Sequence, residues 1–569
     1  MRPWDYQPIT GLRAGKLQVN ADTGNQPNGS ETRLRVWFWV GSAAVTIGVL
    51  LQLPMYIAAR NQGFKLNGMP MDPQMIAGMF LMVIGLAIAA KALINRRPSS
   101  ADTGPGEIRV QALDSTTIGP AHIRLIAVLT AAVAIDTLKP YTFTFILTGV
   151  AKEYDLASPA HHAAGHLPVA LLPFFGILGT AIGSVLWGRL GDLIGRRASI
   201  LLSSLIFIAS SACAAMPAFW ENIVMCFIMG IAVGGFLPVA YSLLVETIPP
   251  ARRGQIVVLV AGIGTAAGFL LAAGSAHWLI PLANWRIMWL VGIPTGLILI
   301  ILNRYIPESP RFLLATGRNV EAREVMRVFG AAVDRDGDQP TASEPTGTAS
   351  TALGGSAFHL FFPPYMGITA VLTILGLAWG VVNFGFIVWV PTDLAHAGLH
   401  GAHISAILAE AALFSVPGAA VAAWLYRKSA KITFAVFSAT SAAALGAFAM
   451  FAKVIISNTP ALTGLLALLL VSMWGTISII GPYGAEVYPT SWRASGSGIA
   501  NGATKAGGVF ALALAVTSVA PPGIAGAAML GAIPMLLAAI GIIVIGVETT
   551  GQPVDTINPG NRLSILTHH

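Results

Sequence analysis

The sequence predicts an all-α polytopic membrane protein of about 14 transmembrane helices, built as two six-helix halves plus an N-terminal helix pair. Three observations predict this class. The 569 residues are 55% hydrophobic and only 10% charged, whereas soluble domains carry about 25% charged residues. Apolar runs of about 20 residues, long enough to cross a bilayer as a helix, recur along the chain. One region also repeats itself at an offset of 240 residues.

The apolar runs place the helices in order along the chain. The first eight predicted spans are 36–59, 74–94, 125–150, 168–188, 198–217, 222–245, 255–281 and 285–304. After a polar interval, the last six are 365–392, 403–426, 431–452, 461–485, 494–519 and 523–547. With both termini in the cytoplasm, 26 of the 33 Lys and Arg residues fall on the inner side and 5 on the outer side. This asymmetry predicts cytoplasmic termini and a multi-pass protein of the bacterial inner (plasma) membrane.

These spans divide the chain into seven segments. They are a disordered cytoplasmic tail (1–35), an extra two-helix extension (36–94), a cytoplasmic linker (95–121), the N-terminal half (122–305), a cytoplasmic central loop (306–362), the C-terminal half (363–547) and a cytoplasmic C-terminal tail (548–569). The extension has no charge in the middle of its spans. We therefore expect it to pack peripherally or to form an oligomer contact.

An internal repeat relates the two predicted halves. The segment ETIPPARRG, which begins at Glu246, aligns with EVYPTSWRA, which begins at Glu486, so that Arg253 aligns with Arg493. Duplicated halves are typical of transporters that rock around a central site. The alternative is that such Glu-Pro-Arg turns are shared by the helix ends of many polytopic proteins.

The link GRLGDLIGRR concentrates charge between two apolar runs. Its glycines permit a sharp turn, and its aspartate can face a helix N-terminus or a nearby arginine. Its two final arginines can contact anionic lipid, or they can serve only to orient the chain. The candidate residues of this link are Gly188, Gly191, Asp192, Gly195, Arg196 and Arg197.

This link resembles the signature of the major facilitator superfamily, G-x-L-x-D-x-x-G-R-R. PESPRFLLATGR, from Pro307, is similar to the segment after the sixth core helix of sugar porters and metabolite–proton symporters, and the two repeated segments resemble that group's paired links. The resemblance covers roughly residues 122–550 and implies the major facilitator fold. It also implies that the link is a gate latch on the cytoplasmic side. Its further members would be Glu246, Arg253, Glu486 and Arg493.

The sequence departs from the family pattern at three places. The second-half counterpart of the link, WLYRKSAKITF, lacks the Gly-Asp core, so we do not expect a symmetrical second latch. Cys226 stands where the family often has an arginine in its fourth helix. The segment WGVVNFGFIVWVP also lacks the paired glutamines of sugar porters. A hexose is therefore not the expected substrate.

Two charges lie close together within the third predicted span. Asp136 and Lys139 are three residues apart, which puts them on one helical face, and Pro140 follows directly. A charge at this depth costs about 2.5–3.5 kcal/mol on insertion scales. We therefore expect Asp136 to bind the proton and Lys139 to be its switchable partner, which receives a substrate carboxylate when Asp136 is protonated. The alternative is an ion pair that only holds helices together.

Two further charged residues lie within predicted spans. Lys505 is a second cation in the middle of a span, and it is a candidate for contact with an anionic substrate or an acidic partner. Snorkelling toward the interface is the alternative. Glu410 is a secondary proton-coupling candidate, and its alternative is a residue of an outer vestibule.

Aromatic residues predict the lining of a pocket for a flat or partly apolar solute. Trp379, Asn383 and Phe384 fall on the first helix of the second half, and Tyr141 falls on the helix that carries Asp136. Aromatic side chains within spans also serve in packing and as interface anchors.

The predicted function is a secondary active transporter that moves a small organic anion or metabolite, with protons, by alternating access. Its predicted partners are a carboxylate-bearing small molecule, protons and the lipid bilayer, while the oligomeric state stays open. We expect no enzyme activity, cofactor, metal or nucleic acid, because no phosphate-binding loop, nucleophile motif or zinc motif is present. The alternatives are an uncoupled facilitator, a drug or metabolite exporter, and a sensor with the transporter fold.

Overall fold

The computed structural model describes residues 29–94, 116–158, 166–331, 357–488, 493–517 and 523–549. Within these ranges the chain is helical, and the only β pairing is one isolated bridge between Ala157 and Pro168. Thirteen of the described helical segments are long and apolar enough to cross a membrane. A shorter apolar segment, Leu171–Trp187, occupies the position of the remaining predicted span, 168–188. The prediction of an all-α polytopic membrane protein is confirmed.

The helices follow the predicted order. In the first part of the chain they are α1 (Gly29–Leu50), α2 (Leu53–Ala58), η1 (Ala59–Gln62), α3 (Pro73–Ile94), α4 (Pro120–Tyr154), α5 (Leu171–Ile194), α6 (Arg196–Ser210), η3 (Ser211–Ala215), α7 (Phe219–Thr247), α8 (Pro250–Ala283), α9 (Ile287–Leu290), α10 (Gly292–Leu302) and η4 (Asn303–Tyr305). The second part contains α11 (Pro310–Ala315), α12 (Asn319–Val328), η5 (Ala357–Phe361), α13 (Met366–Val382), η6 (Asn383–Ile387), α14 (Val390–His396), α15 (Gly401–Lys428), α16 (Ala430–Ile456), α17 (Thr459–Val487), α18 (Arg493–Val516) and α19 (Gly523–Ile545).

Two predicted spans are interrupted rather than continuous. The first begins at Gly29 rather than at Val36, and it breaks after Leu50 before α2 restarts with a proline in its first turn. Proline suits this position because it has no N–H to leave unpaired there. The span that begins with α13 changes to a π-helix at Asn383–Ile387 before α14 completes it. Hydropathy carries no signal for either break, because both sides of each break are apolar.

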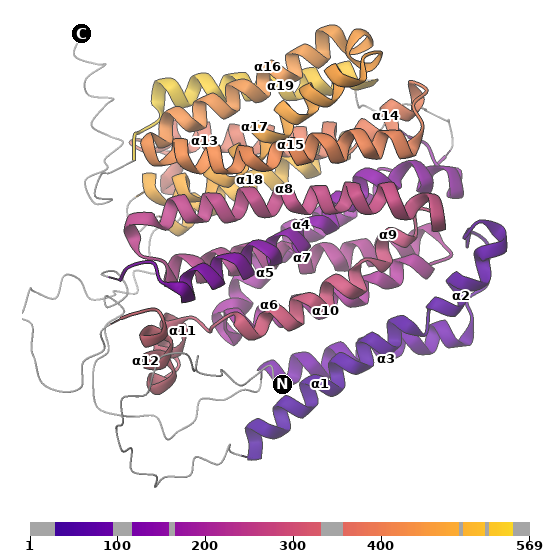
Figure 1. The fold of residues 1–569 in the computed structure, drawn as a ribbon, viewed down its shortest axis with the longest axis horizontal. Helices are drawn as coiled ribbons and strands as arrows, with labels where there is room; N and C mark the ends of the chain where they lie inside the picture. Colours follow the sequence, from indigo (N-terminus) through magenta and orange to yellow (C-terminus); the bar gives the residue numbers. More distant parts are fainter. Residues whose placement is uncertain are drawn as a thin grey trace, which may run out of the picture.

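The helices form two packed groups. Helices α4 to α10 contact one another, with close pairs α5–α7 and α4–α8, and helices α13 to α19 do the same, with close pairs α16–α19 and α13–α18. Figure 1 shows the second group, in orange and yellow, lying along the first, in purple and magenta. The groups meet through α8 with α15 and α17, α5 with α18, and α4 with α14. The central helix α4 therefore lies where both groups can contact it.

The bundle has two ends, the Arg196 face and the Arg286 face. The Arg196 face contains the start of α6 together with α11 and α12, and the Arg286 face contains the α8–α9 link together with α2 and α14. In Figure 1 these are the left and right ends of the bundle.

The extra helix pair packs along one side of the first group. Helices α1 and α3 lie against each other, and both contact α6. Their buried side chains, Phe38, Val45 and Met82 among them, share one hydrophobic cluster with Leu201 and Leu205 of α6. The pair is therefore an additional layer on the N-terminal group (Figure 1).

Candidate functional site

Lys139 points into the N-terminal group. Its side chain is 1% exposed, its Nζ lies 3.5 Å from Ser210 Oγ, and it lies 6.0 Å from the ring centre of Trp289. Gly292 makes room for it, because a Cβ at that position would lie 2.1 Å from the Lys139 Nζ. The predicted pairing of Lys139 with Asp136 is therefore wrong: the spacing put both residues on one side of α4, but the long lysine side chain extends toward η3 and α9 instead.

Asp136 has its electrostatic partners on other helices. The side chain is fully buried, and neither carboxylate oxygen has a hydrogen-bond partner among the described residues. The cation that acts on it is Lys505 of α18, in the C-terminal group, and the third member of this cluster is Tyr241 of α7. The acid and the amine, on helices of different groups, thus interact electrostatically without a direct hydrogen bond. Because both Asp136 oxygens are without a hydrogen bond among the described residues, this carboxylate can respond to a proton or a ligand.

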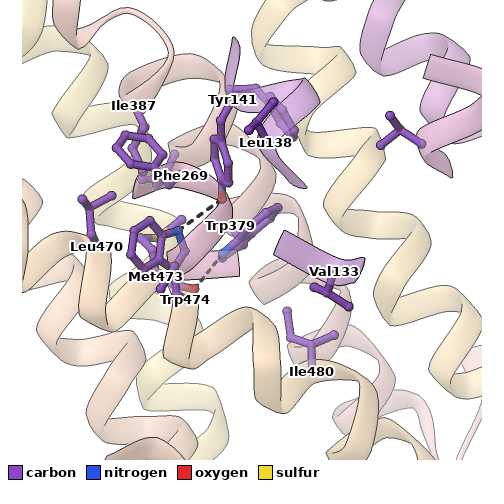
Figure 2. Packing of buried hydrophobic residues seen from close by; sticks show 14 of the residues in the cluster. Val133, Leu138, Tyr141, Phe269, Trp379, Ile387, Leu470, Met473, Trp474 and Ile480 are labelled. Atoms are coloured by element: carbon purple, nitrogen blue, oxygen red, sulfur yellow. Dashed lines mark hydrogen bonds between the residues drawn. The ribbon is translucent and has the colours of Figure 1, made fainter. Parts of the chain in front are cut away.

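An aromatic cluster joins the two groups, with one member on α4, the helix that carries Asp136. Trp474 of α17 donates a hydrogen bond from Nε1 to the Tyr141 hydroxyl, at 3.2 Å. The Phe269 ring of α8 contacts both, with ring centres 4.9 Å from Tyr141 and 5.5 Å from Trp474. Trp379 lies next to them and donates from Nε1 to the Met473 carbonyl at 2.9 Å (Figure 2). The sequence reasoning found Tyr141 and Trp379 but missed Phe269, Trp474 and Tyr241, because one aromatic residue in an apolar span looks like any other.

The π-helix places a polar side chain at the same level. Asn383 is 2% exposed, and its Oδ1 has no hydrogen-bond partner among the described residues. Phe384 follows it and lies edge-on to Trp379, with ring centres 6.3 Å apart. A π-turn often marks a functional position, because it re-aims the side chains of one turn. The predicted set of Trp379, Asn383 and Phe384 is thus brought together in one place.

Glu410 lies apart from this cluster. It is exposed, and it shares a face of α15 with Leu413 and Phe414, which are 58% and 67% exposed. The opposite face of α15 carries the buried residues that pack against α8 and α17. The structure therefore does not bring Glu410 to Asp136, and its role as a secondary proton-coupling residue or as an outer-vestibule residue stays a prediction.

On the Arg196 face, a carboxylate network surrounds the start of α6. Glu308 accepts hydrogen bonds from the backbone N–H groups of Arg196 at 2.7 Å and Arg197 at 3.3 Å. The Arg196 guanidinium pairs with Glu246 at 3.3 Å, and the Ser309 hydroxyl donates to the same carboxylate. These bonds tie the end of α7, the start of α6 and the start of α11 together.

The predicted latch also contains glycines and further arginines at the ends of α5, α8 and α18. Gly195 has a φ of +93°, and a Cβ there would lie 2.5 Å from a Glu308 oxygen, so the turn into α6 requires glycine. Gly191 is buried in α5, and its carbonyl accepts from Arg196. Arg253 donates from Nε to the Ile248 carbonyl at 3.3 Å. Gly188 and Asp192 lie on α5 and Arg493 begins α18, but their surroundings are outside the described part of the structure.

The C-terminal group carries a similar network, in which the carboxylates and the hydroxyl stand 240 residues after their counterparts. Glu548, the counterpart of Glu308, accepts from the Ala430 N–H at the start of α16, at 2.9 Å. Thr549, the counterpart of Ser309, donates to Glu486, the counterpart of Glu246, at 2.6 Å. Tyr426 also donates to Glu486, at 2.7 Å. The missing Gly-Asp core therefore does not remove the carboxylates that cap the helix, while the absence of a symmetrical second latch stays a prediction.

Replacing Glu308 by Ala is expected to lower the melting temperature of the purified protein. The N–H groups of Arg196 and Arg197 would lose their acceptor, at about 1–3 kcal/mol for each unpaired donor. Glu308→Gln keeps an acceptor oxygen and is expected to cost less than about 1 kcal/mol. Burial raises the pKa of Glu308, against the opposing effect of these N–H donors, and so favours the neutral form that glutamine mimics.

The raised pKa also sets the direction of a pH effect. The stabilising contribution of protonated Glu308 is complete below its ordinary value of 4.5 and is lost as the pH rises through the folded-state pKa. Wild type is therefore expected to lose stability relative to Glu308→Gln over this range in thermal unfolding. Glu321→Gln, an exposed carboxylate on α12, is the control. If Glu308→Gln were as unstable as Glu308→Ala at neutral pH, the charge itself would be the stabilising feature.

Two six-helix groups related by an internal repeat, with an acid and an amine buried where they meet, define a membrane transporter. The family model of the Major Facilitator Superfamily matches residues 125–512. The chain belongs to this family.

Comparison with known proteins gives relatives of one functional class. The niacin transporter NiaP of Acinetobacter baylyi is 28% identical over 454 residues, which cover 79% of this chain and 99% of that protein. A gallate transporter of Pseudomonas putida is 28% identical over 345 residues, covering 59% of this chain and 73% of that protein. The solved structure of the proton:xylose symporter XylE, a protein of E. coli, is similar with a TM-score of 0.59 and 18% identity, over 77% of this chain and 98% of that one. The protein is a multi-pass transporter of small-molecule metabolites.

Proposed function

We propose that this protein is a proton-coupled transporter of a small organic anion, in which Asp136 binds the proton and Lys505 binds the anionic group. The observation that supports this most is the buried Asp136 carboxylate, with both oxygens unpaired and Lys505 facing it from the other group. A carboxylate held at this depth is costly unless it takes part in function.

The proposed cycle uses the competition between proton and substrate charge. Ionised Asp136 attracts the Lys505 ammonium and holds the two groups together. When Asp136 takes up a proton, Lys505 loses its counter-charge and can bind the carboxylate of a substrate. Release of both on the other side restores the attraction. Lys505 takes the role that the sequence reasoning assigned to Lys139, because it is the amine that Asp136 faces.

The aromatic cluster supports a planar substrate. Tyr141, on the same helix as Asp136, packs with Phe269 and Trp474, and Trp379 lies next to them. Asn383 offers an unpaired amide oxygen to a donor. Niacin and gallate, the compounds in the names of two relatives, are both aromatic carboxylates. We therefore include a small aromatic carboxylate in the proposal.

The proposal also includes the orientation of the protein in the membrane and the halves that move during transport. The excess of Lys and Arg on one side assigns the Arg196 face and both termini to the cytoplasm of a bacterial inner membrane. Residues 122–305 and 363–547 are the halves that rock. The networks of Glu246 with Arg196 and of Glu486 with Thr549 hold the helix ends of each half on the cytoplasmic side.

The test is transport in proteoliposomes with labelled nicotinate and labelled gallate. Counterflow without a gradient is expected for at least one of them, together with accumulation under an inward proton gradient that a protonophore abolishes. Counterflow with no response to the protonophore would identify an uncoupled facilitator. No counterflow with any compound of a carboxylate panel would contradict transport of this substrate class.

A further inference from the structure

The connection between the two extra helices is bonded to the end of the transport helix α4. We name residues 59–72, which join α2 to α3 on the Arg286 face, the outer loop. In this loop the backbone N–H groups of Leu66 and Asn67 donate to Glu153 Oε1, at 2.9 and 3.3 Å. Asn67 also donates from Nδ2 to the Glu153 carbonyl, at 3.1 Å. Leu66 is fully buried, so the loop packs against the protein at this point.

Glu153 is also the centre of a buried ion pair. Its Oε1 lies 2.7 Å from a terminal nitrogen of Arg286, and the two side chains are 2% and 0% exposed. Trp285 donates from Nε1 to the second Glu153 oxygen at 2.8 Å. Arg286 donates further to the Met216 carbonyl at 2.8 Å and to the Tyr154 hydroxyl at 2.7 Å. The end of α4 is thus joined to the α8–α9 link, to the segment after η3 and to the outer loop.

A second contact fixes the other end of the outer loop. The Tyr56 hydroxyl donates to the Ala283 carbonyl at 2.5 Å, and Asn284 donates from Nδ2 to the Gly63 carbonyl at 3.3 Å. The Tyr56 ring stacks on Phe64, with centres 5.0 Å apart. The loop is therefore held both at α4 and at the end of α8.

Toward the C-terminal group, the same end of α4 makes a much lighter contact. Thr148 of α4 and Thr392 of α14 share a hydrogen bond of 3.3 Å between neutral hydroxyls. A neutral hydrogen bond is worth about 0.5–1.5 kcal/mol, whereas each bond to a charged group is worth about 1.5–3 kcal/mol. Glu153 and Arg286 make several of the stronger kind. One further bond joins the groups near this face, between His277 Nδ1 of α8 and the Ala402 carbonyl of α15 at 2.9 Å. Opening of the Arg286 face between α4 and α14 requires only the threonine contact to break.

We propose that the outer loop is a strap and that Glu153 is a positioning residue, which together keep the end of α4 fixed to the N-terminal group. The Arg286 face then opens by movement of α13, η6 and α14, while the extra helix pair, α4 and α8 move as one body. This inference rests on the proposed alternating access, because it states which parts move. It assigns the extra helices a part in transport, in place of the peripheral packing expected from their sequence.

The test measures distances between spin labels in the full-length protein in liposomes. One cysteine pair is Gln62→Cys with Lys152→Cys, which reports on the loop and α4. The other is Gln62→Cys with Ala397→Cys, which reports on the loop and the exposed end after α14. Both pairs are built on Cys213→Ala and Cys226→Ala, since those native cysteines are buried. Measurements are made at acidic and alkaline pH, with and without nicotinate.

The first pair is expected to give one narrow distance in all conditions, and the second pair to give two populations. The double variant Tyr56→Phe/Asn67→Ala removes the Tyr56 bond at the α2 side of the strap and the Asn67 side-chain bond within it, and it is expected to broaden the first distribution. Asn61→Ala, an exposed substitution in the same loop, is the matched control. Two distance populations in both cysteine pairs would overturn the strap proposal but not alternating access. A distance distribution of the double variant as narrow as that of the control would do the same. A single distance population in both cysteine pairs would overturn the strap proposal together with alternating access.

Discussion

Asp136→Asn is expected to abolish accumulation of substrate against its gradient while leaving exchange of substrate across the membrane. Asparagine has nearly the shape of a protonated aspartate, but it neither binds nor releases a proton. The coupled cycle therefore loses its proton-binding step, and net accumulation is expected to fall by at least about tenfold, which corresponds to 1.4 kcal/mol of lost driving force. The measurement is uptake of labelled nicotinate into proteoliposomes under an inward proton gradient, with counterflow measured on the same preparation.

Glu410→Gln is the matched control for this prediction. It makes the same kind of change, a carboxylate to an amide within a predicted span, on the exposed face of α15. Accumulation by Glu410→Gln is expected to equal that of wild type. Undiminished accumulation by Asp136→Asn would remove the proposed proton site, and loss of accumulation by Glu410→Gln would return that residue to the coupling route.

Lys505→Gln is expected to weaken substrate binding strongly. A buried charged group that loses its charged partner costs about 2–5 kcal/mol, so the affinity for a carboxylate is expected to fall roughly 30-fold or more. The same variant leaves Asp136 buried without its cation, so its melting temperature is also expected to fall. The measurements are the Kd of nicotinate, from quenching of tryptophan fluorescence, and thermal unfolding.

Two further variants separate a binding role from a structural one. Lys139→Gln changes a fully buried lysine that lies inside the N-terminal group beside Ser210, and it is expected to leave the Kd of nicotinate unchanged. The double variant Asp136→Asn/Lys505→Gln is expected to melt higher than Lys505→Gln, because it removes the stranded charge. If Lys139→Gln weakened binding and Lys505→Gln did not, the roles of the two lysines would be reversed.

Much of the fold follows from local sequence. The order of the helices and most of their bounds were predictable, because a span needs only a run of apolar residues long enough to cross the bilayer. The internal repeat was equally visible, since Glu246 and Glu486 stand at one offset. The break after Leu50 and the π-helix at Asn383–Ile387 were not predictable, because the residues on both sides of each interruption are apolar.

The candidate site was predictable residue by residue but not as an arrangement. Asp136 and Lys505 stand out in the sequence, because a charge within an apolar span is rare and costly. Their relation was missed, since the spacing of Asp136 and Lys139 on one helix favoured the nearer lysine. Glu153 drew no attention at all, because a glutamate at the end of a span looks like an ordinary solvated residue.

The sequence by itself determined that this chain crosses the membrane many times in two repeated halves and that it buries an acid and two amines. Tertiary structure alone decided which amine the acid faces, that the second half has its own carboxylate network, and that the extra helices are bonded to α4. The physical reason is the range of each effect. The preference of an apolar residue for the bilayer does not depend on which residues surround it in the fold. Charge pairs and hydrogen bonds act over a few ångströms, between residues that only folding brings together.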